Sequence, residues 1–186
     1  NLVRSMGFSL IGALLGKGYA VVLRPHPHIM IYDRDKVEDI RQAYGGNPHF
    51  TLDLSFDDRS HLFDAALMIS DWSGVAYEYA FVTERPVLFV DVPRKVFNPN
   101  WQKVGLPTME DICRSEVGLI ASPEEVIDKA ALLLADRDRW RERIRAARER
   151  HLYHFRNSCR IASDYLCAIT PPVGQGTAEG ERVTTR

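Results

Sequence analysis

The stretch "LMISDWSGVAYEYAFVTERPVLFVD", residues 67–91, decides the fold class. It opens with an apolar run, turns polar at 70–74, continues as a helical pattern, and returns to an apolar run that begins after Pro86. Strands that are continuous apolar runs, without alternation, are typical of parallel sheets covered on both faces. The stretch therefore predicts a strand–helix–strand unit of a parallel sheet.

The alternation of helical and strand patterns continues on both sides of this unit. We expect further strands at 19–25, 49–54 and 117–122, and helices at 5–18, 33–46, 57–66, 122–152 and 157–169. A loop rich in Pro and Asn occupies 92–111. These elements predict an α/β fold, a Rossmann-like parallel sheet with helices on both faces.

The length of the chain limits its domain organisation. With 186 residues, 45% of them apolar, the chain has room and core material for one domain. We assign that ordered domain to residues 1–169. Residues 170–186 contain neither aromatic residues nor periodicity, which predicts a disordered tail. Because the chain starts without Met and inside a helical pattern, we expect it to be a fragment of a larger protein.

Composition argues against several function classes. The formal net charge of −1 disfavours bulk electrostatic binding of nucleic acid. The arginine run at 136–150 is interleaved with acids, which favours an ion-paired, solvated helix face over an RNA-binding surface. No apolar run reaches the roughly 18–20 residues of a membrane span. The three cysteines lack CxxC spacing, which indicates unbonded thiols, and without an HExxH pattern or a Cys/His cluster we predict no metal and no cofactor.

The polar junction at 70–74 is the first candidate site. Ligands of open parallel sheets bind beyond the carboxyl ends of the strands, and this junction follows such a strand. A helix that begins near Gly74 presents free N–H groups and the positive end of its dipole. Ser70 and Ser73 can donate hydroxyl hydrogens to an anion, so the junction resembles a phosphate site. The simpler alternative is that Ser73 or Asp71 only caps the helix.

The second candidate site is "RPHP" at residues 24–27. Arg24 and His26 follow a buried strand, and the two prolines around His26 are expected to fix an extended backbone and to prevent a helix. Arg24 suits bidentate phosphate binding, and His26 can donate to a phosphate or transfer a proton near neutral pH. The alternative is a polar strand end without a function.

These residues together resemble the CDP-glycerol glycerophosphotransferases of the teichoic acid poly(glycerol phosphate) polymerase type. The resemblance rests on the order of four motifs: RPH at 24–26, SDWSG at 70–74, EYA at 78–80 and ERPVLFVD at 84–91. It covers about residues 8–168. The resemblance implies the C-terminal, donor-binding lobe of a GT-B fold, with the N-terminal lobe lying outside this chain.

The resemblance also implies roles for these residues. Ser70, Asp71, Ser73 and Gly74 would surround the donor diphosphate at the start of the helix. Glu78 would approach the ribose or the transferred group; a solvated helix residue is the alternative.

His26 and Arg24 would stabilise charge on the phosphates as CMP leaves. The reaction would transfer glycerol phosphate from CDP-glycerol to a hydroxyl of a polymer or lipid-linked acceptor held by the missing lobe. The resemblance further implies a cytoplasmic protein with peripheral contact to the inner face of the bacterial membrane.

Two other function classes stay open at this point. A GT-B glycosyltransferase or epimerase using a UDP-sugar would share a diphosphate site at a helix start. A non-catalytic lobe that binds a nucleotide or a partner protein would share it too. The nucleotide preference distinguishes the first of these from a CDP-glycerol enzyme.

Overall fold

A computed structural model describes residues 2–55, 57–93, 96 and 98–170. The chain divides into two compact units, residues 1–148 and 149–186, and each is described by itself. The boundary falls in the last turn of a long helix, inside the domain predicted at 1–169. Most of the tail predicted at 170–186 lies outside the described residues.

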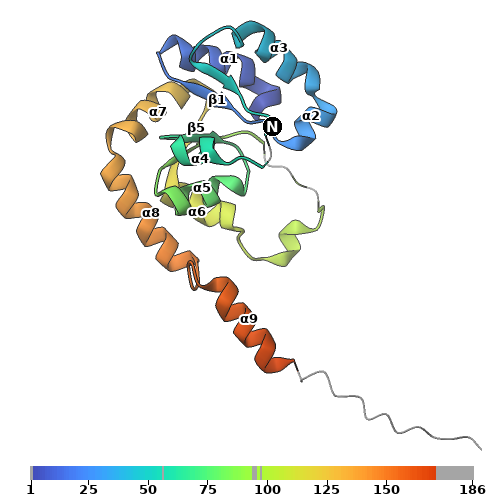
Figure 1. Ribbon diagram of the computed structural model, residues 1–186, viewed down its shortest axis with the longest axis vertical. Helices are drawn as coiled ribbons and strands as arrows, with labels where there is room; N and C mark the ends of the chain where they lie inside the picture. Colours follow the sequence, from blue (N-terminus) through green and yellow to red (C-terminus); the bar gives the residue numbers. More distant parts are fainter. Residues whose placement is uncertain (1, 56, 94–95, 97, 171–186) are drawn as a thin grey trace, which may run out of the picture. The chain divides into compact units, whose positions relative to one another are not determined.

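The first unit contains two small parallel sheets (Figure 1). One has the order β1–β2, formed by β1 (Val21–Leu23) and β2 (Phe50–Leu52). The other has the order β3–β4–β5, formed by β3 (Met68–Ser70), β4 (Val87–Val90) and β5 (Gly118–Ala121). Every strand pair is parallel, which confirms the predicted α/β class with parallel sheets.

Helices connect these strands, as parallel pairing requires. Those up to β4 are α1 (Leu2–Gly16), α2 (Pro27–Tyr32), α3 (Arg34–Tyr44), α4 (Ser60–Asp64) and α5 (Val75–Thr83). Those after β4 are the short 3₁₀ helices η1 (Trp101–Val104) and η2 (Pro123–Glu125), and α6 (Met109–Val117), α7 (Val126–Ala135), α8 (Arg137–His151) and α9 (Ser158–Ile169).

The three-stranded sheet forms the best-buried part of the first unit. All four residues of β4 are fully buried, which requires cover on both faces of that strand. Helices α5 and α6 contact each other and the sheet, and α7 packs on β4 and β5. β5 lies very close to β4 at Gly118, where a Cβ atom would come within 1.7 Å of the Val87 carbonyl oxygen.

The two-stranded sheet has its own smaller core. Ile11 of α1, Ile40 of α3, Leu23 of β1 and Phe50 of β2 are buried against one another. The start of α1 extends to the other sheet, because the Leu2 backbone N–H donates to Asp71 directly after β3 at 2.9 Å. Helix α1 thus connects the carboxyl ends of both sheets within the first unit.

Three elements differ from the sequence expectations. The extended backbone predicted at 25–27 ends at His26, and Pro27 begins α2, because proline is tolerated at the first helical position. The helix predicted at 122–152 is interrupted at Asp136, whose backbone leaves the helical region. The sequence predicts a loop at 92–111 and no element at 112–116, but Thr108 and Asp111 form a capping box that starts α6.

The second unit contains α9 and the turn before it. The Ser158 hydroxyl donates to the carbonyl oxygens of Tyr153 and His154, which fixes this turn. Cys159 and Cys167 are both free and exposed on α9. Across the part of the chain that is described in both units, no helix has the length and apolarity to cross a membrane.

Candidate functional site

The turn between β3 and α5 leaves a helix start open at the carboxyl edge of the three-stranded sheet. Ser70 ends β3, and Gly74 precedes the first residue of α5. Among the described side chains, none caps this helix. A Cβ atom at Gly74 would meet no atom within 4 Å, so the space beside the backbone is open. The turn therefore offers an uncapped, accessible helix N-terminus of the kind that binds anions.

Asp71 does not cap α5, which was the simpler alternative for this residue. Its side chain is buried and accepts a hydrogen bond from the backbone N–H of Leu2 at 2.9 Å. Ser73 is half-buried and does not cap α5. The two residues that were candidates for a simple helix cap thus leave the cap position empty.

Trp72 connects the turn to the loop after β4. Its indole Nε1–H donates to the Val92 carbonyl oxygen at 2.9 Å. The ring is stacked by a guanidinium, since the Cζ atom of Arg114 lies 4.1 Å from the ring centre. The same Cζ atom lies 5.3 Å from the ring centre of Phe89 in β4. A cation is therefore held against the turn between β3 and α5.

Arg114 was not predicted from the sequence. It lies on α6, is only 5% exposed, and has one ion pair, from Nη1 to Asp91 at 3.7 Å. Its Nε and Nη2 atoms are buried and have no hydrogen-bond partner in the described structure. The capping box of Thr108 and Asp111 was the available sequence signal, because it predicts a helix over the following residues.

The positive charge of Arg114 also acts on Tyr77, which lies in the first half of α5. Burial is the main cause that raises the pKa of its phenol, and the Glu110 carboxylate adds to this rise. The positive charge of Arg114 acts in the opposite direction and lowers the pKa. Tyr77 also stacks on Phe89, with ring centres 5.6 Å apart. Arg114 thus acts electrostatically on α5 as well as on the turn before it.

The second sequence motif lies at the end of the other sheet. Arg24 follows β1, as predicted, and its Nη1 donates to the buried Asp53 carboxylate at 3.0 Å and to the Asp58 carbonyl oxygen at 2.6 Å. His26 caps α2, because its Nδ1 accepts the backbone N–H of His28 at 3.2 Å. Both residues thus have structural contacts at the strand end, which fits the interpretation of the motif as a polar strand end.

The start of α1 lies between the two motifs. Leu2 is bonded to Asp71 of the junction, and Arg4 makes a bidentate pair with Asp33 directly after α2, with N–O distances of 2.8 and 2.7 Å. Arg24 and His26 follow β1 of the two-stranded sheet, whereas residues 70–74 lie at the end of β3, in the three-stranded sheet. Glu78 is exposed in the first turn of α5 and adjoins the open helix start.

The cavities of the first unit do not coincide with the junction. The larger one, about 640 Å³, is an open groove between α1 and α3 that is lined by residues such as Gly7, Phe8 and Ile40. The second lies against α3 and β2. Neither of these two grooves is lined by residues of the junction.

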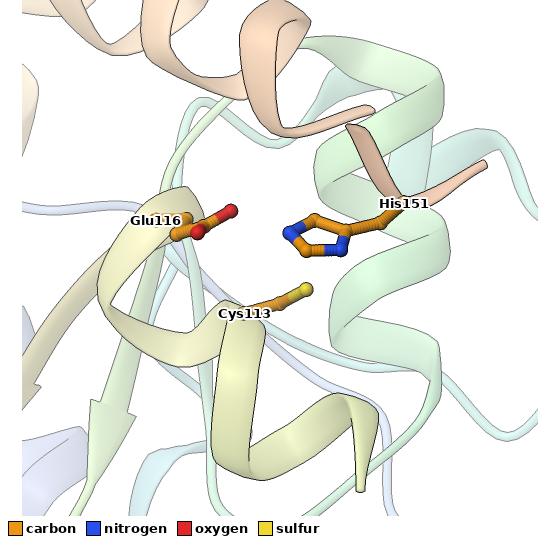
Figure 2. A group of neighbouring side chains, drawn as sticks. All are labelled: Cys113, Glu116 and His151. Carbon is orange, nitrogen blue, oxygen red and sulfur yellow. The ribbon is translucent and has the colours of Figure 1, made fainter. Parts of the chain in front are cut away.

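Among the residues that the structure describes, potential metal ligands do not gather within either unit. Figure 2 shows Cys113 and Glu116, which both belong to α6, together with His151 at the end of α8. Because His151 belongs to the second unit, the three residues define no metal site inside one unit. We therefore build no chemistry on them.

Comparison with known proteins gives no relatives: no family model, no curated protein and no solved structure matches the chain.

Proposed function

We propose that this chain is the donor-binding lobe of a CDP-glycerol-type glycerophosphotransferase with a GT-B architecture. One observation carries the proposal: the uncapped start of α5 at the carboxyl edge of a parallel sheet, beside the cation of Arg114. Backbone N–H groups, a helix dipole and a guanidinium together favour a phosphate group over a neutral ligand. The order of the sequence motifs supplies the nucleotide and the transferred group.

The residues of the junction have distinct tasks in this proposal. Ser73 and the N–H groups around Gly74 bind the diphosphate, and Ser70 donates from the strand end. Asp71 holds the turn through its bond to Leu2. Glu78, exposed one turn into α5, accepts hydroxyl hydrogens of the ribose or of glycerol.

The proposed reaction is a displacement at the β-phosphorus of CDP-glycerol. An acceptor hydroxyl forms the new P–O bond as its proton is removed, the bond to the bridging oxygen breaks, and CMP leaves with the electron pair. Donors fixed in advance stabilise the charge that develops on the phosphates. His26 contributes from the end of β1, and the contacts of Arg24 with Asp53 and Asp58 keep that strand end in place. Peripheral association with a membrane that carries the acceptor is part of this proposal.

Calorimetric titration of the chain with CDP-glycerol, CDP, CMP and UDP tests the proposal. CDP-glycerol and CDP are expected to bind more tightly than CMP, because they add a second phosphate at the helix start, and more tightly than UDP if the donor nucleotide is the one the motifs imply. Ser73→Ala should weaken CDP binding about tenfold, as expected when one hydrogen bond to a charged group is lost. His26→Ala should affect CDP-glycerol more than CMP.

Ser9→Ala is the matched control, since Ser9 is exposed on α1 and its hydroxyl donates to the Met6 carbonyl oxygen within the same helix. It should bind CDP like the unchanged chain. Preference for UDP would replace the proposal with a glycosyltransferase or epimerase that uses a UDP-sugar. Absence of binding for every nucleotide would contradict a donor lobe.

A further inference from the structure

Arg114 presents an unused hydrogen-bonding edge inside the first unit. A guanidinium donates in a planar fork, and Nε and Nη2 form the edge that faces away from Nη1. Nη1 lies 3.7 Å from Asp91, and that carboxylate belongs to a side chain that is 63% exposed. Nε and Nη2 are the buried side-chain donors without a hydrogen-bond partner in the described part of the chain. The unused edge is the one that matches two oxygens of a phosphate.

Such an arrangement is unfavourable for folding alone. Buried polar groups in proteins nearly always have partners, and an unpaired donor leaves its desolvation penalty uncompensated. The position lies on the buried face of α6 beside Cys113 and Val117, where an apolar side chain of similar volume would fit without this penalty. The contacts with Trp72 and Phe89 offset only part of it.

The geometry directs the guanidinium to the phosphate site. Side chains of a helix point back toward its N-terminus. Helix α6 runs from the carboxyl edge of the sheet to the amino edge, where β5 begins, so Arg114 extends toward the carboxyl edge. There it lies between Trp72, which follows β3, and Asp91, which follows β4. The contact with Trp72 places the guanidinium next to the turn that begins α5.

We propose that Arg114 is the side-chain ligand of the phosphate bound at the start of α5, and that its Nε–Nη2 edge binds two oxygens of that group. The inference rests on the proposed function only for the presence of a phosphate at the turn; it names the residue that neutralises the phosphate. Asp91 is the counter-ion of Arg114 while no ligand is bound. Because the edge is covered in the ligand-free chain, the guanidinium turns toward the solvent side, where Asp91 lies, when the phosphate binds.

Asp91 therefore opposes binding. Its carboxylate is the one acid within ion-pair distance of Arg114 in the described structure, and its negative charge repels an anion that approaches the Nε–Nη2 edge. Replacing it by the neutral Asn should increase the affinity for an anion. This increase should require Arg114.

The test measures binding of inorganic pyrophosphate and of CDP by calorimetry for the unchanged chain, Arg114→Met, Arg114→Lys and Asp91→Asn. Arg114→Met should weaken both ligands about tenfold to a hundredfold, the loss expected for a charge-assisted bidentate pair, while the melting temperature stays equal or rises. Arg114→Lys keeps the charge but not the fork and should recover only part of the affinity. Asp91→Asn should strengthen pyrophosphate binding severalfold, and the gain should vanish when Arg114→Met is also present.

Arg143→Met is the matched control, because Arg143 also stacks on a tryptophan, with Cζ 4.6 Å from the Trp140 ring centre, but lies on α8. It should bind pyrophosphate normally. In nitrogen-labelled protein, the Nε–H signal of Arg114 should shift on adding pyrophosphate, whereas that of Arg143 should not.

The outcomes separate this inference from the proposed function. Equal binding by Arg114→Met, or by Arg114→Lys if the methionine variant does not fold, overturns the inference even if CDP still binds through Ser73. Pyrophosphate binding that depends on Arg114 without any preference for CDP supports the inference and overturns the proposed function. Binding of neither ligand by the unchanged chain overturns both.

Discussion

The guanidinium carbon of Arg114 lies 4.1 Å from the centre of the Trp72 ring, although 42 positions separate the two residues in the chain. Trp72 belongs to the turn that starts α5, and Arg114 belongs to the helix that leads into β5. This contact places the cation of Arg114, on α6, beside the start of α5, the preceding crossover helix. Positive charge and a helix start that no described side chain caps therefore occur together at the β3–α5 turn.

Glu84 should be important for the stability of the first unit. Its carboxylate accepts from Arg145 at 2.8 Å and from Arg148 at 2.9 Å, and this connects the end of α5 to α8. The hydrogen bond from Arg145 is the main cause that lowers the pKa of Glu84. Glu84→Gln should reduce the free energy of unfolding at pH 7 by about 1–2 kcal/mol, because two guanidinium groups lose their anion.

Urea denaturation measures this difference. Glu142→Gln removes an α8 carboxylate that acts on Arg145 through its charge and leaves both hydrogen bonds of Glu84 in place. It should change the free energy of unfolding by less than about 0.5 kcal/mol. Equal effects of the two variants would contradict the role assigned to Glu84.

Gly118→Ala should be among the most destabilising single substitutions in the chain. The added methyl carbon would lie 1.7 Å from the Val87 carbonyl oxygen, so β4 and β5 would have to separate. We expect a loss of at least about 2–3 kcal/mol, as for other overpacked cores. Gly16→Ala, at a position with no atom within 4 Å, is the control and should be neutral or stabilising. Thermal unfolding of both variants distinguishes them, and a neutral Gly118→Ala would refute the close strand contact.

The fold and the helix start of the site follow from local sequence, whereas Arg114 does not. The apolar runs at 67–70 and 87–90 and the glycine before α5 are sufficient to predict a strand, a turn and a helix. Nothing local marks Arg114 as buried, because its burial depends on Trp72 and Phe89, which are distant in sequence. Helix α2 was missed because a proline signals either an extended segment or a helix start, and only the tertiary structure decides.

The Arg24–Asp53 pair shows the same limit. Both residues follow strands, so their presence at one sheet edge is predictable once β1 and β2 are neighbours. The pairing of β1 with β2 is a property of the topology, which the RPHP motif does not contain. The motif alone therefore fits a ligand-binding Arg24 and a structural Arg24 equally well.

Asp53 should make stability depend on pH in acid. A hydrogen bond from the Ser55 hydroxyl is the largest cause that lowers its pKa below 3.8, and the Ser55 backbone N–H and the Arg24 charge add to it. A carboxylate with a depressed pKa in the folded state stabilises fully above its unfolded pKa, and this contribution is lost as pH falls through the folded value. The free energy of unfolding should therefore decrease below about pH 4.

Asp53→Asn isolates this contribution. At pH 7 the variant should be less stable by about 1–3 kcal/mol, because Arg24 and Ser55 lose a buried acceptor, and the difference should shrink at pH 3. Asp39→Asn, which changes an exposed acid on α3, should leave stability unchanged within about 0.5 kcal/mol at both pH values. A constant difference between pH 7 and pH 3 would show that Asp53 has no depressed pKa.

The most direct test of the central claim is to map the backbone amide shifts of the nitrogen-labelled chain during titration with CDP-glycerol. We predict that the largest shifts occur at Ser73, Gly74 and Val75, whose N–H groups would receive the diphosphate. The N–H groups of Ala76, Tyr77 and Glu78 already donate to the carbonyl oxygens of Ser73 and Gly74 and should shift less. Shifts centred on the groove between α1 and α3, or no shifts at saturating ligand, would contradict a donor site at this turn.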